Sequence, residues 1–167
     1  VLAGLRVLII HSGGDSRRLP HCSAAGKIFV KLPKQRPDGS SAALFDEVIC
    51  SVAPICRRLA QGVIVLSGDV LLTFDAGAVS GTEGDVIGVA AAVDAQTASR
   101  HGVYVLDRRG RITDFLQKPT IAHMRAAGAL TDDQKAMLDT GLLLFNTASA
   151  AALAVLGGLS VEDGRAS

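Results

Sequence analysis

A short apolar run near the N-terminus ends in small residues and is followed by fixed cations, in the order Ser12, Gly13, Gly14, Arg18 and Lys27. Glycine lets backbone N–H groups approach phosphate oxygens because no Cβ intervenes. Arginine offers forked donors to such oxygens, and lysine offers a compact positive charge. We therefore expect this stretch to form a loop that binds a polyphosphate.

The spelling of this loop excludes two common phosphate-binding loops. A Walker-type loop requires a glycine at position 21 and a hydroxyl residue after Lys27, where this chain has His21 and Ile28. The dinucleotide fingerprint requires Gly-x-Gly-x-x-Gly, which the pair Gly13-Gly14 does not begin. A solvated turn would explain a diglycine alone, but its occurrence together with the strand and the cations favours phosphate binding.

Asp69 is a second candidate, because it follows the apolar run 63–66 and Gly68 directly. Ligand sites of open α/β sheets collect where buried strands end. A carboxylate there suits Mg²⁺, which prefers oxygen ligands and keeps substrate phosphates as partners. The alternative is an aspartate that caps the next turn. The polyphosphate loop favours the metal site.

Two further stretches carry candidate residues near the C-terminal half. Lys118 ends a predicted strand immediately before Pro119, which suits a cation aimed at a phosphate. Asp139 and Gly141 lie in a predicted strand, and small polar groups beside a glycine can bind sugar hydroxyls. A surface lysine and ordinary turn chemistry explain these residues equally well when each stretch is taken alone.

The spacing of apolar residues predicts the elements that position these candidates. Continuous runs and alternation predict strands, and recurrence every three or four residues predicts helices. We expect Ser40 or Ser41 to cap the first helix, Pro54 to kink or divide it, and 131–135 to cap another helix. The predicted strands span 5–10, 28–32, 62–67, 85–93 and 137–145, with a turn at 36–39, a hairpin over 101–118, and helices over 42–60, 120–129 and 148–156. This order indicates a mixed sheet on an α/β frame.

Composition limits the classes of protein to consider. The 167 residues suit one domain, and 49% hydrophobic but only 4% aromatic residues indicate a core of aliphatic side chains. A net charge of +1 gives no field that would recruit nucleic acid or an anionic membrane. No apolar run reaches the roughly 18 residues of a membrane span. Three cysteines fit no metal-ligand spacing, so we expect a reducing cytoplasm.

In their order along the chain, these stretches resemble the sugar-1-phosphate nucleotidyltransferases, or nucleotide-sugar pyrophosphorylases. The resemblance runs from Val7 to about Asn146. The matching positions are Gly13-Gly14, Arg18-Leu19, Lys27, Gly68-Asp69, Gly102, Asp107, Gly110, Ile112 and Lys118-Pro119. The order and spacing of all four stretches make the resemblance more specific than any one of them.

Departures from the common pattern narrow the resemblance. Ser16-Arg17 and Gly26-Lys27 stand where Gly-Thr and Pro-Lys are usual, and this spelling is similar to the fucose-1-phosphate guanylyltransferase branch. That branch includes bifunctional fucokinase/GDP-fucose pyrophosphorylases. Gln117 replaces the usual glutamate before Lys-Pro, which puts one sugar contact in doubt, and no second metal aspartate is identified before Ser167.

The resemblance implies a fold and a reaction. The expected fold is a Rossmann-like three-layer α/β/α domain (GT-A-like) with a mixed, mainly parallel central sheet. Residues 1–167 would form the nucleotidyltransferase catalytic domain, as a fragment lacking its C-terminal part. The expected reaction transfers a nucleotidyl group from a nucleoside triphosphate, GTP, to a sugar-1-phosphate, fucose-1-phosphate, and releases pyrophosphate. A fused sugar kinase domain is an expected partner in the full-length protein.

The resemblance also assigns roles to the candidates. Arg18 would neutralise the leaving pyrophosphate, Lys27 the triphosphate, and Asp69 would hold Mg²⁺ between the reacting phosphates. The base and phosphates would lie against Ser12, Gly13 and Gly14, and the sugar phosphate against Lys118, Asp139 and Gly141. Two alternatives stay open at this point: a nucleotide-sugar-binding or regulatory domain that does not catalyse, and the same reaction with another pair of substrates.

Overall fold

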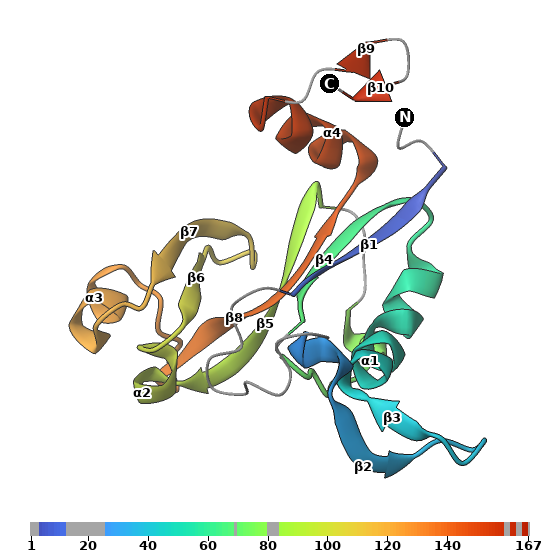
Figure 1. The fold of residues 1–167 in the computed structure, drawn as a ribbon. Helices are drawn as coiled ribbons and strands as arrows, with labels where there is room; N and C mark the ends of the chain where they lie inside the picture. The colour runs from blue at the N-terminus through green and yellow to red at the C-terminus, as the bar shows by residue number, and fades with distance from the viewer. Residues whose placement is uncertain are drawn as a thin grey trace. The chain divides into compact units, whose positions relative to one another are not determined.

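The computed structural model describes the chain in segments: residues 4–12, 26–68, 70–79, 84–158, 161–162 and 165–166. The chain forms two compact units, the first made of residues 1–87 and 143–167 and the second of residues 88–142. Strand β8 (Lys135–Phe145) begins in the second unit and ends in the first. Figure 1 shows the elements of both units.

The first unit contains most of the helical residues. Its elements are β1 (Arg6–His11), the 3₁₀ helix η2 (Lys27–Phe29), β2 (Lys31–Gln35), β3 (Ser41–Ala43), α1 (Leu44–Arg58), β4 (Gly62–Ser67), the 3₁₀ helix η3 (Ala76–Ala78), α4 (Thr147–Leu156), β9 (Val161–Glu162) and β10 (Arg165–Ala166). The two final strands pair with each other, in a stretch for which the sequence predicts no element.

The sheet of the first unit places two strand ends side by side. β1 runs parallel to β4, from the pair Arg6–Gly62 to the pair His11–Ser67. The last three residues of β8 run antiparallel to β4 on its other edge. Ile64 and Leu66 on β4 are buried, as the continuous apolar run predicts. Because β1 and β4 are parallel, their carboxyl ends meet at one edge.

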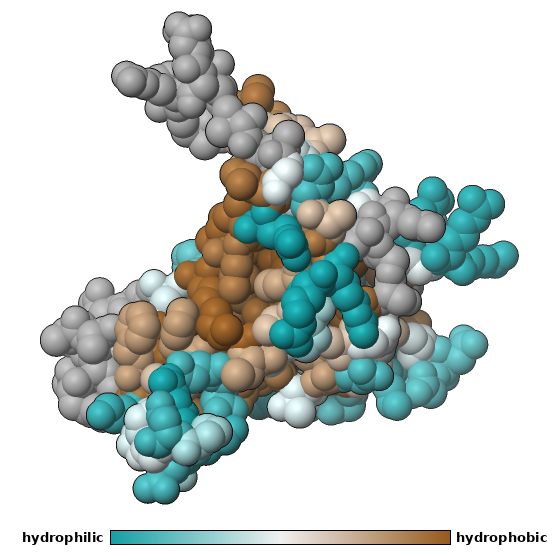
Figure 2. Space-filling view, turned by 90° about the vertical axis from the view of Figure 1, so that its right-hand side faces the viewer, coloured by the Kyte–Doolittle hydropathy of each residue, from teal (hydrophilic) through white to brown (hydrophobic). Residues whose placement is uncertain are grey.

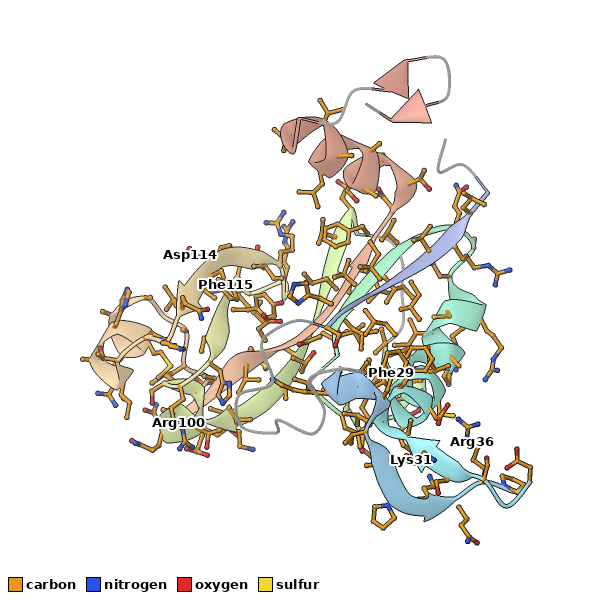
Figure 3. All side chains as sticks on the ribbon, in the orientation of Figure 1. Phe29, Lys31, Arg36, Arg100, Asp114 and Phe115 are labelled. Carbon is orange, nitrogen blue, oxygen red and sulfur yellow. The ribbon has the colours of Figure 1, made fainter. Side chains whose placement is uncertain are left out.

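β2 and β3 form an antiparallel arm between η2 and α1. The predicted turn at 36–39 is confirmed, since Gly39 N donates to Arg36 O at 2.9 Å and Gly39 has a φ of 82°. The predicted strand 28–32 is wrong at its start, because Lys27–Phe29 is a 3₁₀ turn. In that turn Phe29 packs on Phe45 of α1, with ring centroids 5.4 Å apart (Figure 3).

Helix α1 buries the face that its spacing predicts, with Val48, Val52 and Ile55 almost inaccessible to solvent. Its N-terminal cap differs from the prediction. Ser41 lies in β3, and the carboxylate of Asp46 accepts from Ala43 N at 2.6 Å. The side chain of the third helical residue can accept from the N–H of the capping residue, whereas a capping serine would accept from an N–H inside the first turn. Pro54 does not divide the helix, which continues to Arg58.

The second unit is built around an antiparallel hairpin. Its elements are β5 (Val86–Asp94), which begins in the first unit, α2 (Ala95–Ala98), β6 (Gly102–Leu106), β7 (Ile112–Gln117), α3 (Ile121–Ala126) and the first part of β8. β6 pairs with β7 and with β8, and β5 pairs with β8. A compact cluster closes the unit, made of Ala98, Val103, Val105, Leu116, Met124, Ala129 and Ala136.

Residues 131–135 do not cap a helix, contrary to the prediction. Thr131 N donates to Lys135 O at 2.8 Å, and Thr131 Oγ1 accepts from Lys135 N at 3.1 Å. These two bonds close a turn that leads directly into β8. A threonine followed by acidic residues satisfies the backbone of a turn as readily as that of a helix start.

The mixed sheet is confirmed, but its expected parallel predominance is wrong for the described strands. Of the pairings that flank β4 and β6, β1–β4 is parallel, whereas β4–β8, β6–β7 and β6–β8 are antiparallel. The hairpin turn at 107–111 forces the direction of β7, because a short turn can join only antiparallel neighbours. The three-layer arrangement stays a prediction.

Several large apolar side chains of the first unit are exposed. Figure 2 shows apolar surface on the face turned toward the viewer, and the first unit has exposed apolar residues at Leu5, Ile9, Val155 and Leu156. Among the described residues, no helix is both long and apolar enough to cross a membrane.

The cap of α1 predicts a pH-dependent loss of stability. The Ala43 N–H, and then Arg36, hold the pKa of Asp46 below its ordinary value of 3.8. The ionised carboxylate therefore stabilises the fold above that value, and the contribution disappears as the pH falls through the lowered pKa. We expect Asp46→Ala to lower the melting temperature at about pH 7 and to differ little from the unchanged chain at about pH 2.

Thermal unfolding followed by circular dichroism measures this difference. Asp132→Ala is the control, because Asp132 is exposed and no described residue bonds its side chain. An equal loss for Asp46→Ala at both pH values would contradict a cap made by the carboxylate.

Candidate functional site

In the first unit, the ends of β1 and β4 lie side by side, and several candidate residues follow these strands in the sequence. Gly68 N donates to His11 O at 2.9 Å, which extends the strand pairing by one residue. Ser12 follows β1 directly and is exposed. Gly13, Gly14, Arg18 and Asp69 lie outside the described residues. The described residues that flank these positions in the sequence are therefore Ser12, Gly26, Gly68 and Val70.

A side chain at Gly68 would be tightly packed against its neighbours. A Cβ there would lie 3.1 Å from Ile10 Cγ2, 3.1 Å from Ile28 Cδ1 and 3.2 Å from Ser12 Cβ. These distances are tighter than almost all contacts of a real Cβ, so the glycine lets three chain segments close on the end of β4. The segment before the glycine loop and the segment after it therefore meet beside the residue that precedes Asp69.

Lys27 belongs to the second of these segments. It opens η2, immediately before the buried Ile28, and is itself half-buried. No carboxylate among the described residues pairs with its ammonium group. A half-buried cation without an internal partner is available to an anionic ligand, as the predicted role requires.

In the second unit, the remaining candidates gather at the start of β6. Gly102 is the register partner of Gln117 on β7. On the other edge of β6, a Cβ at Gly102 would lie 3.4 Å from Asp139 Cβ on β8. Lys118 N donates to His101 O at 2.9 Å. The structure therefore brings together two stretches that lie about twenty residues apart in the sequence.

Lys118 has an uncommon backbone conformation. Its φ is 47°, in the left-handed region that residues with a Cβ rarely adopt. Its side chain is exposed, and the following Pro119 is buried. No described residue forms an ion pair with the ammonium group. A strained residue with a free cation is consistent with a functional position.

Asp139 uses one carboxylate oxygen for two internal hydrogen bonds. Its Oδ1 accepts from Tyr104 Oη at 2.7 Å and from Gly141 N at 2.9 Å. The bond to Gly141 N is the turn chemistry that the sequence allows as an alternative. The neighbouring Thr140 bonds elsewhere, since its Oγ1 donates to Val89 O at 2.6 Å.

Tyr104 is the residue of this group that sequence reasoning missed. It is only 6% exposed, and its ring centroid lies 5.5 Å from that of Phe115, which is labelled on β7 in Figure 3. Burial, and then the bond to Asp139, raise the pKa of Tyr104 far above its ordinary value. A buried tyrosine hydroxyl usually has a hydrogen-bond partner. The signal in the sequence is therefore a tyrosine within the apolar run 103–106.

The described residues contain no ready-made metal cage. No group of three or more histidine, cysteine or acidic residues among them could hold a metal ion. Mg²⁺ is commonly bound by one or two carboxylates together with substrate phosphates. The predicted metal site at Asp69 therefore stays a prediction, and it requires no further carboxylates from the described residues.

The close packing around Gly102 gives a test of this geometry. A Cβ at Gly102 would lie 2.5 Å from Phe115 Cζ, so the ring must move. We expect Gly102→Ala to lower the free energy of unfolding by about 1–3 kcal/mol, as overpacking does.

Phe115→Leu removes the ring atom that the new methyl group meets. In that background Gly102→Ala should cost less, with a coupling of at least about 0.5 kcal/mol in denaturant unfolding. Additive losses in the double variant would show that Gly102 and Phe115 are not in contact.

Similarity to known proteins extends over most of the chain. The family described as "Fucose pyrophosphorylase domain" matches residues 1–159. A bifunctional fucokinase/GDP-fucose pyrophosphorylase of Arabidopsis thaliana is 32% identical over 157 residues, which cover 85% of this chain and 15% of that protein.

Two further relatives have related names. A fucose-1-phosphate guanylyltransferase of Mus musculus is 30% identical over 139 residues, 75% of this chain and 23% of that protein. An L-fucokinase/L-fucose-1-P guanylyltransferase of Bacteroides fragilis is 27% identical over 147 residues, 83% of this chain and 15% of that protein. The chain thus spans less than a quarter of the length of each of these relatives.

Proposed function

Because this chain belongs to the fucose pyrophosphorylase family, we propose that it transfers a guanylyl group from GTP to fucose-1-phosphate. The products are pyrophosphate and a nucleotide sugar. The observation that carries the proposal is the match over residues 1–159, which includes both groups of candidate residues. Lys118 and Asp139, brought to one place at Gly102, suit a sugar phosphate in particular.

The residues of the first unit bind the triphosphate in this proposal. Backbone N–H groups of Ser12, Gly13 and Gly14 lie against the base and phosphates, and Arg18 neutralises the leaving pyrophosphate. Lys27 neutralises the triphosphate, a role supported by the half-buried position of the residue and by the lack of a partner for its ammonium group among the described residues. Asp69 holds Mg²⁺, which when bound neutralises negative charge on the phosphates.

The residues of the second unit bind the sugar phosphate. The ammonium group of Lys118 pairs with the phosphate, a role supported by its exposure and by the lack of an ion-pair partner among the described residues. Asp139 and Gly141 lie near the sugar ring, where a carboxylate can accept from sugar hydroxyls. Gln117, in place of the usual glutamate, lies beside Gly102 and can still offer an amide to the sugar.

The reaction is an in-line displacement. An oxygen of the sugar phosphate forms a bond to the α-phosphorus, while the bond from that phosphorus to the oxygen bridging to the β-phosphorus breaks. Pyrophosphate leaves with the electron pair of that bond. The protein contributes position and charge neutralisation, which are the main sources of catalysis in phosphoryl-type transfer.

We further propose a three-layer fold, a fused sugar kinase and a cytoplasmic location. A Rossmann-like, GT-A-like arrangement of three layers is supported by the parallel β1–β4 pair with a site at its carboxyl end. A fused sugar kinase is supported by the names of the bifunctional relatives. A cytoplasmic location is supported by the free thiols of Cys50 and Cys56.

Replacement of the charged residues tests the proposed reaction. We expect Lys27→Ala and Asp69→Ala each to slow pyrophosphate release from GTP and fucose-1-phosphate by about 100-fold or more, since each removes charge neutralisation at the reacting phosphates. The assay follows pyrophosphate in the presence of Mg²⁺, with other nucleoside triphosphates and sugar phosphates as competing substrates.

Lys34→Ala is the matched control. Lys34 lies on the β2–β3 arm, where its ammonium group pairs with Glu47 at 2.8 Å. The Lys34→Ala substitution removes the same kind of side chain as Lys27→Ala but at a residue outside the proposed site, so turnover should be unchanged. Near-normal turnover of Lys27→Ala or Asp69→Ala would refute the assignment.

Two substitutions at Lys118 distinguish the strain of its backbone from the role of its ammonium group. A residue with a Cβ pays about 1–2 kcal/mol in the left-handed region, and glycine does not. Lys118→Gly should therefore be more stable than Lys118→Ala by up to about 1 kcal/mol, because the greater freedom of unfolded glycine offsets part of the gain.

Both variants should lose transfer to the sugar phosphate, because both lack the ammonium group. Denaturant unfolding and pyrophosphate release measure the two effects separately. A glycine variant less stable than the alanine variant would contradict the left-handed backbone, whereas a fully active alanine variant would contradict the phosphate contact.

A further inference from the structure

The two oxygens of the Asp139 carboxylate have different surroundings. Oδ1 accepts two hydrogen bonds, from Tyr104 Oη and from Gly141 N. No described residue donates to Oδ2. Asp139 is half-buried, so solvent does not fully replace a missing donor. The carboxylate is thus fixed at one oxygen and has capacity to accept at the other.

The Tyr104 hydroxyl is placed by packing on several sides. The residue is 6% exposed, and its ring lies 5.5 Å from that of Phe115. A Cβ at Gly88 would lie 2.9 Å from Tyr104 Oη and 3.0 Å from Cζ, so the end of the ring fits against bare backbone. The backbone of Tyr104 is held in register with Met137 of β8. The hydroxyl therefore has little freedom to leave Asp139.

We propose that Tyr104 is a positioning residue for sugar recognition: it fixes one oxygen of Asp139 so that the other accepts a hydroxyl of the sugar-1-phosphate. The inference rests on the proposed function, because it names how the same site selects its sugar. An ionised carboxylate can only accept hydrogen bonds. The site thus requires a sugar hydroxyl at that position, and an analogue without it leaves the carboxylate oxygen unpaired.

The kinetics of Tyr104→Phe distinguish a role in positioning Asp139 from a role in stabilising the fold. Tyr104→Phe keeps the ring and removes only the oxygen, so Asp139 keeps its bond from Gly141 but loses its second anchor. We expect the KM for fucose-1-phosphate to rise by about tenfold, which corresponds to a hydrogen bond to a charged group. The KM for GTP and the kcat at saturating sugar phosphate should stay unchanged, because Tyr104 does not touch the triphosphate in this proposal.

Thr140→Val is the matched control. It removes a hydroxyl from the residue beside Asp139, with a similar loss of one internal hydrogen bond, that between Thr140 Oγ1 and Val89 O. It should leave the KM for fucose-1-phosphate unchanged. The positioning role would be overturned if the KM for fucose-1-phosphate were unchanged in Tyr104→Phe. It would also be overturned if this KM rose equally in Tyr104→Phe and Thr140→Val.

A spectroscopic measurement tests the contact without reference to activity. Tyr104 is the only tyrosine of the chain, and the chain has no tryptophan, so tyrosinate absorption in the near ultraviolet reports this residue alone. At about pH 11 an ordinary tyrosine, with a pKa near 10, is largely ionised. Burial, the larger cause of the raised pKa, keeps tyrosinate low there in the folded wild-type chain, and it persists in Asp139→Asn. In a titration to higher pH, tyrosinate should therefore appear at a lower pH in Asp139→Asn than in wild type, because the neighbouring negative charge is gone.

The outcomes of the two experiments are distinguishable. Circular dichroism in the same samples verifies that each chain stays folded. If a variant unfolds at high pH, tyrosinate absorption is compared at the highest pH at which both chains are folded. Tyrosinate that appears at the same pH in folded wild type and folded Asp139→Asn would overturn the Tyr104–Asp139 contact and the inference with it. If the two titrations differ as expected but the wild-type chain transfers nothing to fucose-1-phosphate, the proposed function is overturned instead.

Discussion

Close approach of chain segments at two glycines is the constraint on which both groups of candidate residues depend. At Gly68, a methyl group would be tightly packed against the side chains of Ile10, Ser12 and Ile28. At Gly102, a methyl group would overlap the ring of Phe115 and lie 3.4 Å from Asp139 Cβ. Each glycine therefore does more than permit a turn. It sets the distance between strands or loops that carry charged groups, and this distance decides which groups can act on one ligand.

Much of the fold follows from patterns that the sequence displays openly. Continuous apolar runs predict β1 and β4, and helical spacing predicts the buried face of α1. The errors arise where one local pattern serves two structures. Thr131 with its acidic neighbours closes a turn into β8, and the helix α1 is capped by Asp46 from inside rather than by a serine before it. In both cases a hydrogen bond that competes with the expected one decides the outcome.

The sequence names candidate site residues one by one, but it does not show which of them lie close together. Lys118 and Asp139 are distant in the sequence, and only the register of β6 with its two neighbours brings them together. Register depends on packing along the whole strand, which periodicity alone does not reveal. Tyr104 escaped notice for a related reason: a single aromatic residue in an apolar strand is typical of a core. Its role depends on where the hydroxyl ends, and that depends on Gly88 and Phe115.

The left-handed backbone of Lys118 has a consequence for how this family can diverge. Where no cation is needed at position 118, glycine or asparagine would relieve the backbone strain, although the greater freedom of unfolded glycine offsets part of that gain. A lysine at this position lowers stability unless its charge is used. The residue found at the equivalent position of another family member therefore indicates whether the charge is needed there.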